Sequence, residues 1–152
     1  MGSEMCIRDR VMSHVMTIST DRAPSPAGHY VQAKLAGQHL YISGQLPIRP
    51  DGAPLPDDGF ATQAGQAIDN MLAVLEAAGG SPSDLVRVTA YIVGVINWPG
   101  FNQVYAARLG EARPARTVVP VAELHYGYLV EVDAIAVLPP NAPAQQSENT
   151  SN

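Results

Sequence analysis

Two charged residues near the C-terminal end of the chain have the types and spacing to do chemistry together. Arg116 follows Pro114-Ala115 at the start of an apolar, β-branched run, and Glu131 lies inside the next such run. An arginine held at a cleft can bind a carboxylate through two parallel hydrogen bonds, and a neighbouring glutamate can orient or deprotonate a water molecule. A plain cross-strand ion pair between Arg116 and Glu131 is the alternative, which the two residues on their own favour.

The alternation of residues around Glu131 predicts the direction in which its side chain points. Glu131 and Asp133 share one face of a predicted strand over residues 129–138, and the small apolar residues 130, 132, 134 and 136 share the other face. We expect the apolar set to pack on helices, which turns both carboxylates toward a subunit interface.

Other signatures of catalysis or cofactor binding are missing from the sequence. It has no glycine-rich nucleotide loop, no H-E-x-x-H, no Cys/His set with zinc spacing and no G-x-S-x-G. The four histidines, at positions 14, 29, 39 and 125, are too scattered to indicate a metal site. We therefore expect neither a metal nor a cofactor.

Length and composition set limits on the class of protein. The 152 residues, 46% of them hydrophobic, suit one globular domain with its own core. A net charge of -5 and nine scattered Lys and Arg residues argue against nucleic-acid binding. No apolar stretch approaches the ~20 residues of a membrane span, and the N-terminus lacks the apolar core of a signal peptide. We expect a soluble, cytoplasmic protein.

The two ends of the chain differ in sequence character from the domain between them. We place that domain at residues 16–138. Residues 1–11 are predicted to be a non-native leader, because Met5-Cys6-Ile7-Arg8-Asp9-Arg10 looks like a translated sequencing adapter, or else a disordered leader. Neither interpretation gives Cys6, the single cysteine, a catalytic role. Residues 139–152, rich in Pro, Ala, Gln, Ser and Asn, predict a disordered tail.

Turn residues and apolar spacing predict the elements of the domain. Two short apolar runs, 30–35 and 38–43, flank Ala36-Gly37 and predict a hairpin, followed by a proline-rich loop over 45–59. Apolar residues that recur at intervals of three and four positions predict helices over 60–78 and 99–109. A β-branched run predicts a strand over 86–93 that is buried on both faces, with Val86 and Val88 on the same face. Strands over 117–121 and 129–138 complete the order β-β-α-β-α-β-β.

Two amphipathic helices can cover one face of such a sheet and leave the other face open. Self-association into a closed ring would bury the open face and create clefts between subunits, where ligand sites commonly form. Burial of that face by the proline-rich loop is the competing account.

From Gly28 to Leu138 the chain resembles the RidA (formerly YjgF) family. The order and spacing of the matching stretches are specific to that family, although each stretch alone is weak. They are Gly28-His29-Tyr30-Val31-Gln32, Tyr41-Ile42-Ser43-Gly44-Gln45, Gln63-Ala64 through Asn70, Asn102-Gln103-Val104-Tyr105, Pro114-Ala115-Arg116 and Val130-Glu131-Val132-Asp133-Ala134-Ile135-Ala136. The resemblance implies a chorismate-mutase-like α+β subunit, with one mixed sheet and two helices on one face, that forms a homotrimer with active sites between subunits.

The resemblance also implies an activity. Members of the family with deaminase activity hydrolyse 2-aminoacrylate, 2-iminobutyrate and related enamines or imines to 2-keto acids and ammonia. By matching position, Arg116 binds the substrate carboxylate and Glu131 positions the attacking water. The remaining pocket residues implied are Tyr30, Ser43 and Asn102, together with backbone groups of Gly44 and Val118. An imine is already electrophilic. Correct orientation of the substrate, one positively charged group that binds its carboxylate and one proton-transfer group therefore suffice without a cofactor.

Some positions depart from the family pattern. Val118 stands where many relatives carry Cys, and the loop His125-Tyr126-Gly127-Tyr128 lacks the Pro usual after Glu123-Leu124. Tyr126 and Tyr128 either narrow the pocket or pack at the interface, and we prefer packing. A non-catalytic binding module for small carboxylates or keto acids is the alternative function. An endoribonuclease or translation inhibitor is a third candidate function, but the net negative charge of the chain argues against it.

Overall fold

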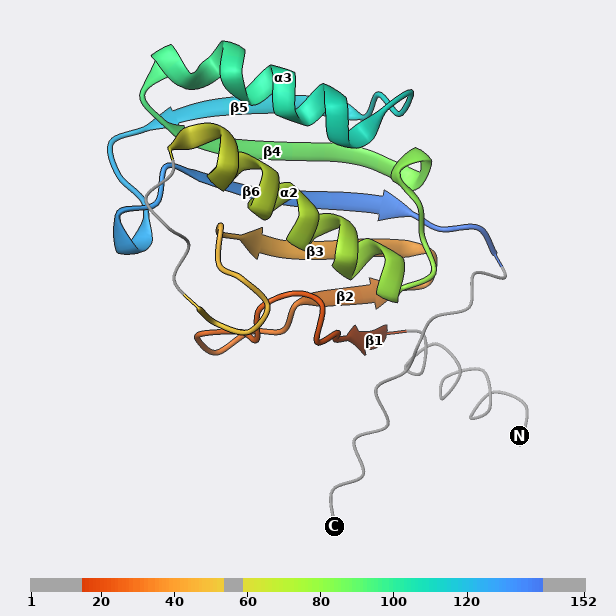
Figure 1. The fold of residues 1–152 in the computed structure, drawn as a ribbon. Helices are drawn as coiled ribbons and strands as arrows, with labels where there is room; N and C mark the ends of the chain where they lie inside the picture. Colours follow the sequence, from red (N-terminus) through yellow and green to blue (C-terminus); the bar gives the residue numbers. More distant parts are fainter. Residues whose placement is uncertain (1–14, 54–58, 141–152) are drawn as a thin grey trace, which may run out of the picture.

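The computed structural model describes residues 15–53 and 59–140 (Figure 1). The predicted leader over residues 1–11 and residues 141–152 of the predicted tail lie outside the described residues. So do residues 54–58 of the proline-rich loop. The remaining part of that loop, 46–53, forms no helix or strand, as its prolines predict.

The fold is one six-stranded mixed sheet with two helices on a single face (Figure 1). The strand order is β1-β2-β3-β6-β4-β5, and every neighbouring pair is antiparallel except β4 and β5. This confirms the predicted α+β class. The elements are β1 Val15–Ile18, β2 Ala33–Ala36, β3 His39–Gln45, α2 Phe60–Ala77, β4 Leu85–Val93, α3 Trp98–Leu109, β5 Ala115–Val121 and β6 Val130–Val137, with 3-10 turns η1 Pro82–Asp84, η2 Val95–Asn97 and η3 His125–Gly127.

Strand β1 was not predicted from the sequence. Its four residues pair antiparallel with β2 at the edge of the sheet, and Ile18 is fully buried. A run this short carries too little alternation to stand out beside the leader. Pairing with β2 along all four residues stabilises it as a strand.

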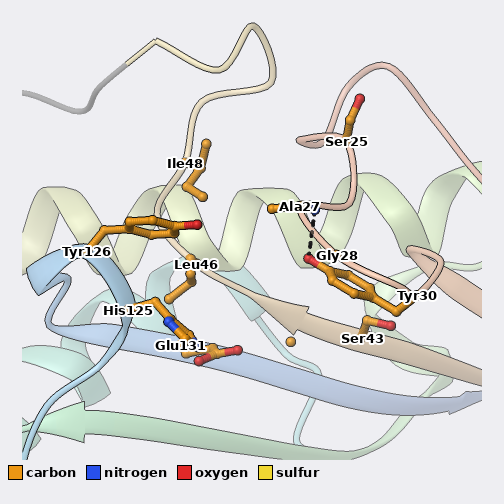
Figure 2. Close-up of a pocket in the computed structure, with 11 residues that line it drawn as sticks. Ser25, Ala27, Gly28, Tyr30, Ser43, Leu46, Ile48, His125, Tyr126 and Glu131 are labelled. Carbon is orange, nitrogen blue, oxygen red and sulfur yellow. Dashed lines mark hydrogen bonds between the residues drawn. The ribbon is translucent and has the colours of Figure 1, made fainter.

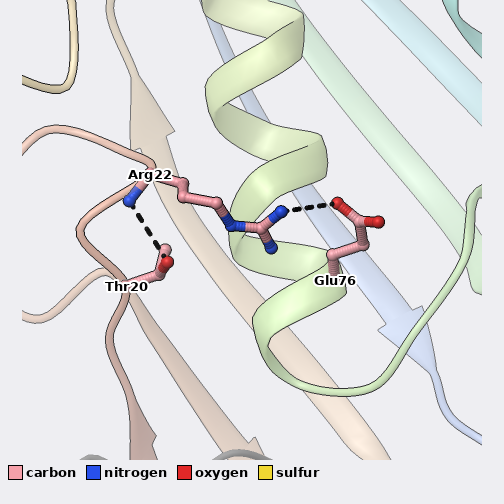
Figure 3. A network of polar contacts seen from close by, with 3 residues as sticks. All are labelled: Thr20, Arg22 and Glu76. Carbon is pink, nitrogen blue, oxygen red and sulfur yellow. Dashed lines mark hydrogen bonds and ion pairs between the residues drawn. The ribbon is translucent and has the colours of Figure 1, made fainter.

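Side-chain hydrogen bonds of Gln32 and Arg22 hold the segment between β1 and β2 in place. The Gln32 side-chain amide, which is buried, donates to the carbonyls of Thr20, Ala23 and Pro24. On the surface, the Arg22 guanidinium donates to Glu76 of α2 over 3.2 Å (Figure 3). An exposed pair of this kind contributes little stability, so the buried Gln32 network is what fixes the segment.

The prediction for strand β4, that it is buried on both faces with Val86 and Val88 on the same face, was wrong in two respects. Val88, Ala90 and Ile92 are buried against the helices, whereas Tyr91 and its neighbours on the opposite face are only half-buried. Val86 does not share the face of Val88, because the register shifts between Leu85 and Arg87 and leaves Val86 exposed.

The alternation predicted for β6 is confirmed. Residues 130, 132, 134 and 136 are buried under the helices, and Glu131 and Asp133 lie on the helix-free face. That face is half-buried along its central strands in a single chain. Within 15–53 and 59–140, no helix has the length and hydropathy of a membrane span.

Candidate functional site

A hollow of about 500 Å³ opens above Glu131 on the helix-free face. It forms where the end of β3, the turn η3 and the segment before β2 meet (Figure 2). Four of the predicted site residues, Tyr30, Ser43, Gly44 and Glu131, line this hollow together. The full lining consists of Ser25, Ala27, Gly28, Tyr30, Ser43, Gly44, Leu46, Ile48, His125, Tyr126 and Glu131.

The Glu131 carboxylate lies directly against the backbone of Gly44. A Cβ atom at position 44 would stand 3.2 Å from the Glu131 Cδ and closer still to its Oε1. The register between β3 and β6 is irregular between Ile42 and Gln45, which carries Gly44 past the carboxylate. Only glycine leaves the carboxylate room in this position.

The surroundings of Glu131 make it a better base than an ordinary glutamate. Burial raises the pKa of the Glu131 carboxyl, and the nearby Asp133 carboxylate raises it further. The His125 side chain opposes both and lowers the pKa. A half-buried carboxylate with a raised pKa that still ionises is suited to accept a proton from water.

Ser43 and Tyr30 shape the wall of the hollow through their own hydrogen bonds. The Ser43 hydroxyl donates to the Val31 carbonyl at 2.6 Å, so its hydrogen is already used within the chain. The Tyr30 hydroxyl accepts a hydrogen bond from the Ala27 backbone N–H at 3.3 Å and is free to donate (Figure 2). Of these two hydroxyls, that of Tyr30 is therefore the one still able to donate a hydrogen bond to a ligand.

Arg116 lies in a different environment, on edge strand β5 and on the helix side of the sheet. Its guanidinium carbon stands 4.9 Å from the ring centre of Tyr105, 5.7 Å from that of Trp98 and 5.9 Å from that of Phe101. Its Nη1 donates to the Asn102 side-chain carbonyl at 2.9 Å. These contacts fix the plane of the guanidinium and leave its other donors available to a carboxylate.

A second hollow, of about 520 Å³, surrounds Arg116. Asn102, Tyr105 and Arg113 line it as well. The Tyr105 hydroxyl is the one buried side-chain polar atom without a hydrogen-bond partner in the part of the chain that the structure describes. An unpaired buried hydroxyl is costly, and an ordered water, a ligand or a neighbouring subunit would each satisfy it.

The two hollows do not meet within one chain. Strand β4 lies between β5 and β6, so the strands that carry Arg116 and Glu131 are not neighbours. Arg116 is in register with Val88 on the helix side, whereas Glu131 is opposite Tyr91 on the helix-free side. The alternative of a cross-strand Arg116–Glu131 ion pair is therefore wrong.

A family model described as Endoribonuclease L-PSP matches residues 20–138, which is nearly all of the described chain. The chain belongs to this family, which is also called YjgF/RidA. The match covers both hollows and every element except β1.

Individual RidA-family relatives agree with this assignment. A RutC family protein of Pyrococcus horikoshii is 41% identical over 119 residues, which are 78% of this chain and 94% of the relative. A 2-iminobutanoate/2-iminopropanoate deaminase of Escherichia coli is 38% identical over 124 residues, 80% of this chain and 96% of the relative. The crystal structure of E. coli TdcF with bound serine superposes with a TM-score of 0.77 at 34% identity, covering 81% of this chain and 98% of that one.

The last predicted site residue of this RidA-family chain, Val118, lines neither hollow. Its side chain packs half-buried against the core, and in the sheet it is in register with Ala90. Only its backbone, two residues beyond Arg116 on edge strand β5, remains available for the predicted role.

Several residues of the Glu131 hollow were missed as site residues, whereas Tyr126 had been considered as one that narrows the pocket. Leu46 and Ile48 come from the proline-rich loop, where no sequence signal distinguishes a lining residue from any other. His125 and Tyr126 come from the loop in which the sequence departs from the family pattern. Tyr126 is 75% exposed and lines the hollow, and Tyr128 packs edge-on against its ring.

Among residues 15–53 and 59–140, no three His, Cys, Asp or Glu side chains gather as metal ligands would. The two arginines around the second hollow suit an anionic ligand.

Proposed function

We propose that this chain is a hydrolytic deaminase of 2-imino acids and their enamine tautomers, with each active site formed between two subunits of a homotrimer. The observation that carries the proposal is the division of charged groups between two hollows. The proton-transfer group Glu131 lies on one side of the sheet, and the carboxylate-binding group Arg116 lies on the other. Each hollow alone offers half of what the reaction needs.

A ring of identical chains is the simplest way to bring the two halves together. In a closed ring, each subunit presents one surface to one neighbour and a different surface to the other. The half-buried helix-free face and edge strand β5 are the two surfaces that such a ring would use. The unpaired Tyr105 hydroxyl beside Arg116 supports a site completed from outside the chain.

The chemistry requires only groups that the two hollows provide. Arg116 binds the substrate carboxylate, and Asn102 together with the aromatic rings holds its guanidinium in place. Water attacks the iminium carbon, the C=N electron pair moves to nitrogen, and Glu131 takes a proton from the water. Glu131 then returns its proton to the nitrogen of the resulting carbinolamine, and ammonia leaves as the hydroxyl oxygen forms the new carbonyl. The hydroxyl proton passes to the released ammonia, which departs as ammonium. A 2-keto acid remains.

Two relatives support this substrate class. One is named a 2-iminobutanoate/2-iminopropanoate deaminase, and its 38% identity extends across 96% of its length. The other was crystallised with serine, a small amino acid that carries the same α-carboxylate and nitrogen as an imino acid.

RNA cleavage, which the description of the family model suggests, is a weaker candidate. The net charge of -5 gives the chain no overall attraction for a phosphate backbone. Absent or salt-insensitive RNA binding would exclude this function.

The proposed reaction can be measured directly. A pyridoxal-phosphate dehydratase supplied with serine or threonine releases the imine, and keto-acid formation is followed while semicarbazide competes for the imine. We expect faster hydrolysis with the protein than without it. We also expect Arg116→Ala to lose about 10- to 100-fold in kcat/KM, as one charged hydrogen-bonding group is removed.

Arg108→Ala is the matched control, because Arg108 pairs with Asp69 on the outer surface of the helices. It should keep full activity. A correctly assembled wild-type protein that gives no gain over spontaneous hydrolysis contradicts the proposal. Saturable binding of 2-ketobutyrate without turnover would instead identify a binding module for small carboxylates.

A further inference from the structure

One wall of the Glu131 hollow carries no charge. We call it the apolar wall, and it consists of the side chains of Leu46, Ile48 and Tyr126. Figure 2 shows these three side chains on the side of the hollow that the loop after β3 and the turn η3 form. Placed against this wall, an apolar group is stabilised by leaving water, whereas a charged group loses its water and finds no partner in the wall.

Helix α2 holds the Leu46 and Ile48 part of the apolar wall in place. The side-chain amide of Asn70, a fully buried residue of α2, donates to the Leu46 carbonyl at 3.0 Å and to the Ile48 carbonyl at 2.8 Å. The Asn70 side-chain oxygen accepts from Gln66 at 2.8 Å, which fixes the orientation of the amide. The Ile48 N–H also donates to the Leu46 carbonyl and tightens the turn. Both apolar side chains are therefore in position before a ligand binds.

The turn η3 supplies the third side chain of the apolar wall and leaves it uncovered. Tyr126 has a left-handed backbone, with φ of 61°, which a non-glycine residue keeps only when its surroundings hold it. Two hydrogen bonds close this turn, from Gly127 N–H to the Leu124 carbonyl and from Tyr128 N–H to the His125 carbonyl. The Tyr126 ring nevertheless stays 75% exposed at the hollow, so most of its surface is free to contact a ligand.

The proposed reaction determines which part of the substrate reaches this wall. The imine carbon carries a carboxylate, the nitrogen and a side chain. Arg116 of the neighbouring subunit binds the carboxylate, and the carbon lies beside Glu131, where the water attacks. The side chain is the remaining group, and the rest of the Glu131 hollow is the space open to it.

We propose that Tyr126 is a specificity-determining residue whose ring, together with Leu46 and Ile48, receives the substrate side chain, so that imino acids with an aromatic side chain are preferred to those of alanine. The inference rests on the proposed function and names its substrate class. An aromatic group gains from the exposed Tyr126 ring beyond the area that it buries, because two rings attract each other when stacked with an offset or edge to face. The loop that carries Tyr126 is the one that departs from the family pattern.

The first test compares two imines that differ in their side chain. An amino-acid oxidase converts phenylalanine or alanine to its imino acid, catalase removes the hydrogen peroxide formed, and keto-acid formation is followed while semicarbazide competes. We expect the kcat/KM of the wild-type protein to be about 10-fold higher or more for the phenylalanine imine, as for an apolar group bound in an apolar pocket. An equal or lower value for the phenylalanine imine overturns the inference.

Substitutions test whether the preference comes from the apolar wall. Tyr126→Ala should lower kcat/KM for the phenylalanine imine about 3- to 10-fold more than for the alanine imine, the worth of one aromatic pair. Tyr126→Phe keeps the ring and should keep the preference. Val86→Ala is the control, since it removes an exposed apolar side chain near the start of β4 and should change neither value. An equal loss for both imines in Tyr126→Ala, or a trimer that dissociates, would mean that the ring packs between subunits and overturns the inference.

The second test does not depend on turnover. Isothermal titration calorimetry measures the Kd of phenylpyruvate and of pyruvate, the two keto acids that the imines yield. Phenylpyruvate should bind the wild-type protein about 10-fold more tightly, and Tyr126→Ala should reduce this advantage about 3- to 10-fold. Equal affinities for the two keto acids overturn the inference. A protein that shows the difference in binding but hydrolyses neither imine would keep the aromatic subsite and contradict the proposed function alone.

Discussion

Arg116 and Glu131 lie on opposite faces of one sheet, on strands that are separated by β4. No change in the side-chain conformation of either residue within one chain can bring the two together across the sheet. Under the proposed function, the reaction therefore takes Arg116 from one subunit and Glu131 from another.

A mixing experiment tests this division. Arg116→Ala and Glu131→Gln should each lose most of their activity as pure proteins, and mixed trimers of the two should recover activity. In randomly mixed rings, a site is intact when an Arg-bearing chain is followed by a Glu-bearing chain, which gives about a quarter of the wild-type activity per subunit. The measurement is imine hydrolysis after joint refolding of the two variants.

The control for mixing is the double variant Arg116→Ala/Glu131→Gln refolded with wild-type chains. It contributes neither group, so every mixed site that it enters loses at least one of the two residues. Mixed single variants that assemble into rings and stay inactive would show that one chain supplies both groups.

Gly44→Ala should abolish activity while the fold survives. The added methyl would collide with the Glu131 carboxylate and displace it, and a displacement of about 1 Å can cost on the order of 100-fold in rate. Steady-state kinetics measures the loss in kcat, and circular dichroism checks the fold. Gly100→Ala, in helix α3, is the control. A Cβ atom at position 100 would meet only the Phe60 ring of helix α2, at 3.8 Å. This variant should keep full activity and gain slightly in stability, as alanine favours a helix.

Tyr105→Phe should separate ligand binding from stability. Since the Tyr105 hydroxyl is buried and has no partner within the described residues, its removal should leave the melting temperature unchanged or raise it. If a bound carboxylate satisfies this hydroxyl, KM should rise about 3- to 10-fold, the worth of one hydrogen bond. A lowered melting temperature with unchanged KM would instead place the partner of the hydroxyl in the protein assembly.

The sequence was sufficient to predict which face of β6 is buried and where both helices lie along the chain. On β6, small apolar residues alternate with charged ones, so the period of two predicts that Val130 is buried and that Glu131 points away from the helices. The apolar spacing of Phe60–Ala77 predicts helix α2 equally well.

The strand order could not be predicted in the same way. Nothing in the local pattern says that β4 pairs in parallel with β5 through the α3 crossover and so separates Arg116 from Glu131. The exposure of Val86 depends on a bulge that no residue type marks. Both features arise from pairing between distant segments, which residue preferences do not record.

Glu131→Gln should be more stable than the wild-type protein at neutral pH. Because burial raises the pKa of Glu131 in the folded state, folding favours the protonated form. The stabilisation by this group is present below the unfolded pKa and is lost as the pH rises through the folded pKa. At neutral pH the wild-type protein therefore holds a carboxylate in an unfavourable place, a cost often found at active sites.

Thermal unfolding at two pH values measures this effect. At pH 7 the glutamine variant should melt a few degrees above wild type, and the difference should shrink toward pH 4, where the wild-type carboxyl becomes protonated. Glu76→Gln is the control, because Glu76 is exposed in its pair with Arg22 and should change stability little at either pH. A glutamine variant that melts below wild type at pH 7 would mean that the contacts of the ionised Glu131 outweigh its burial.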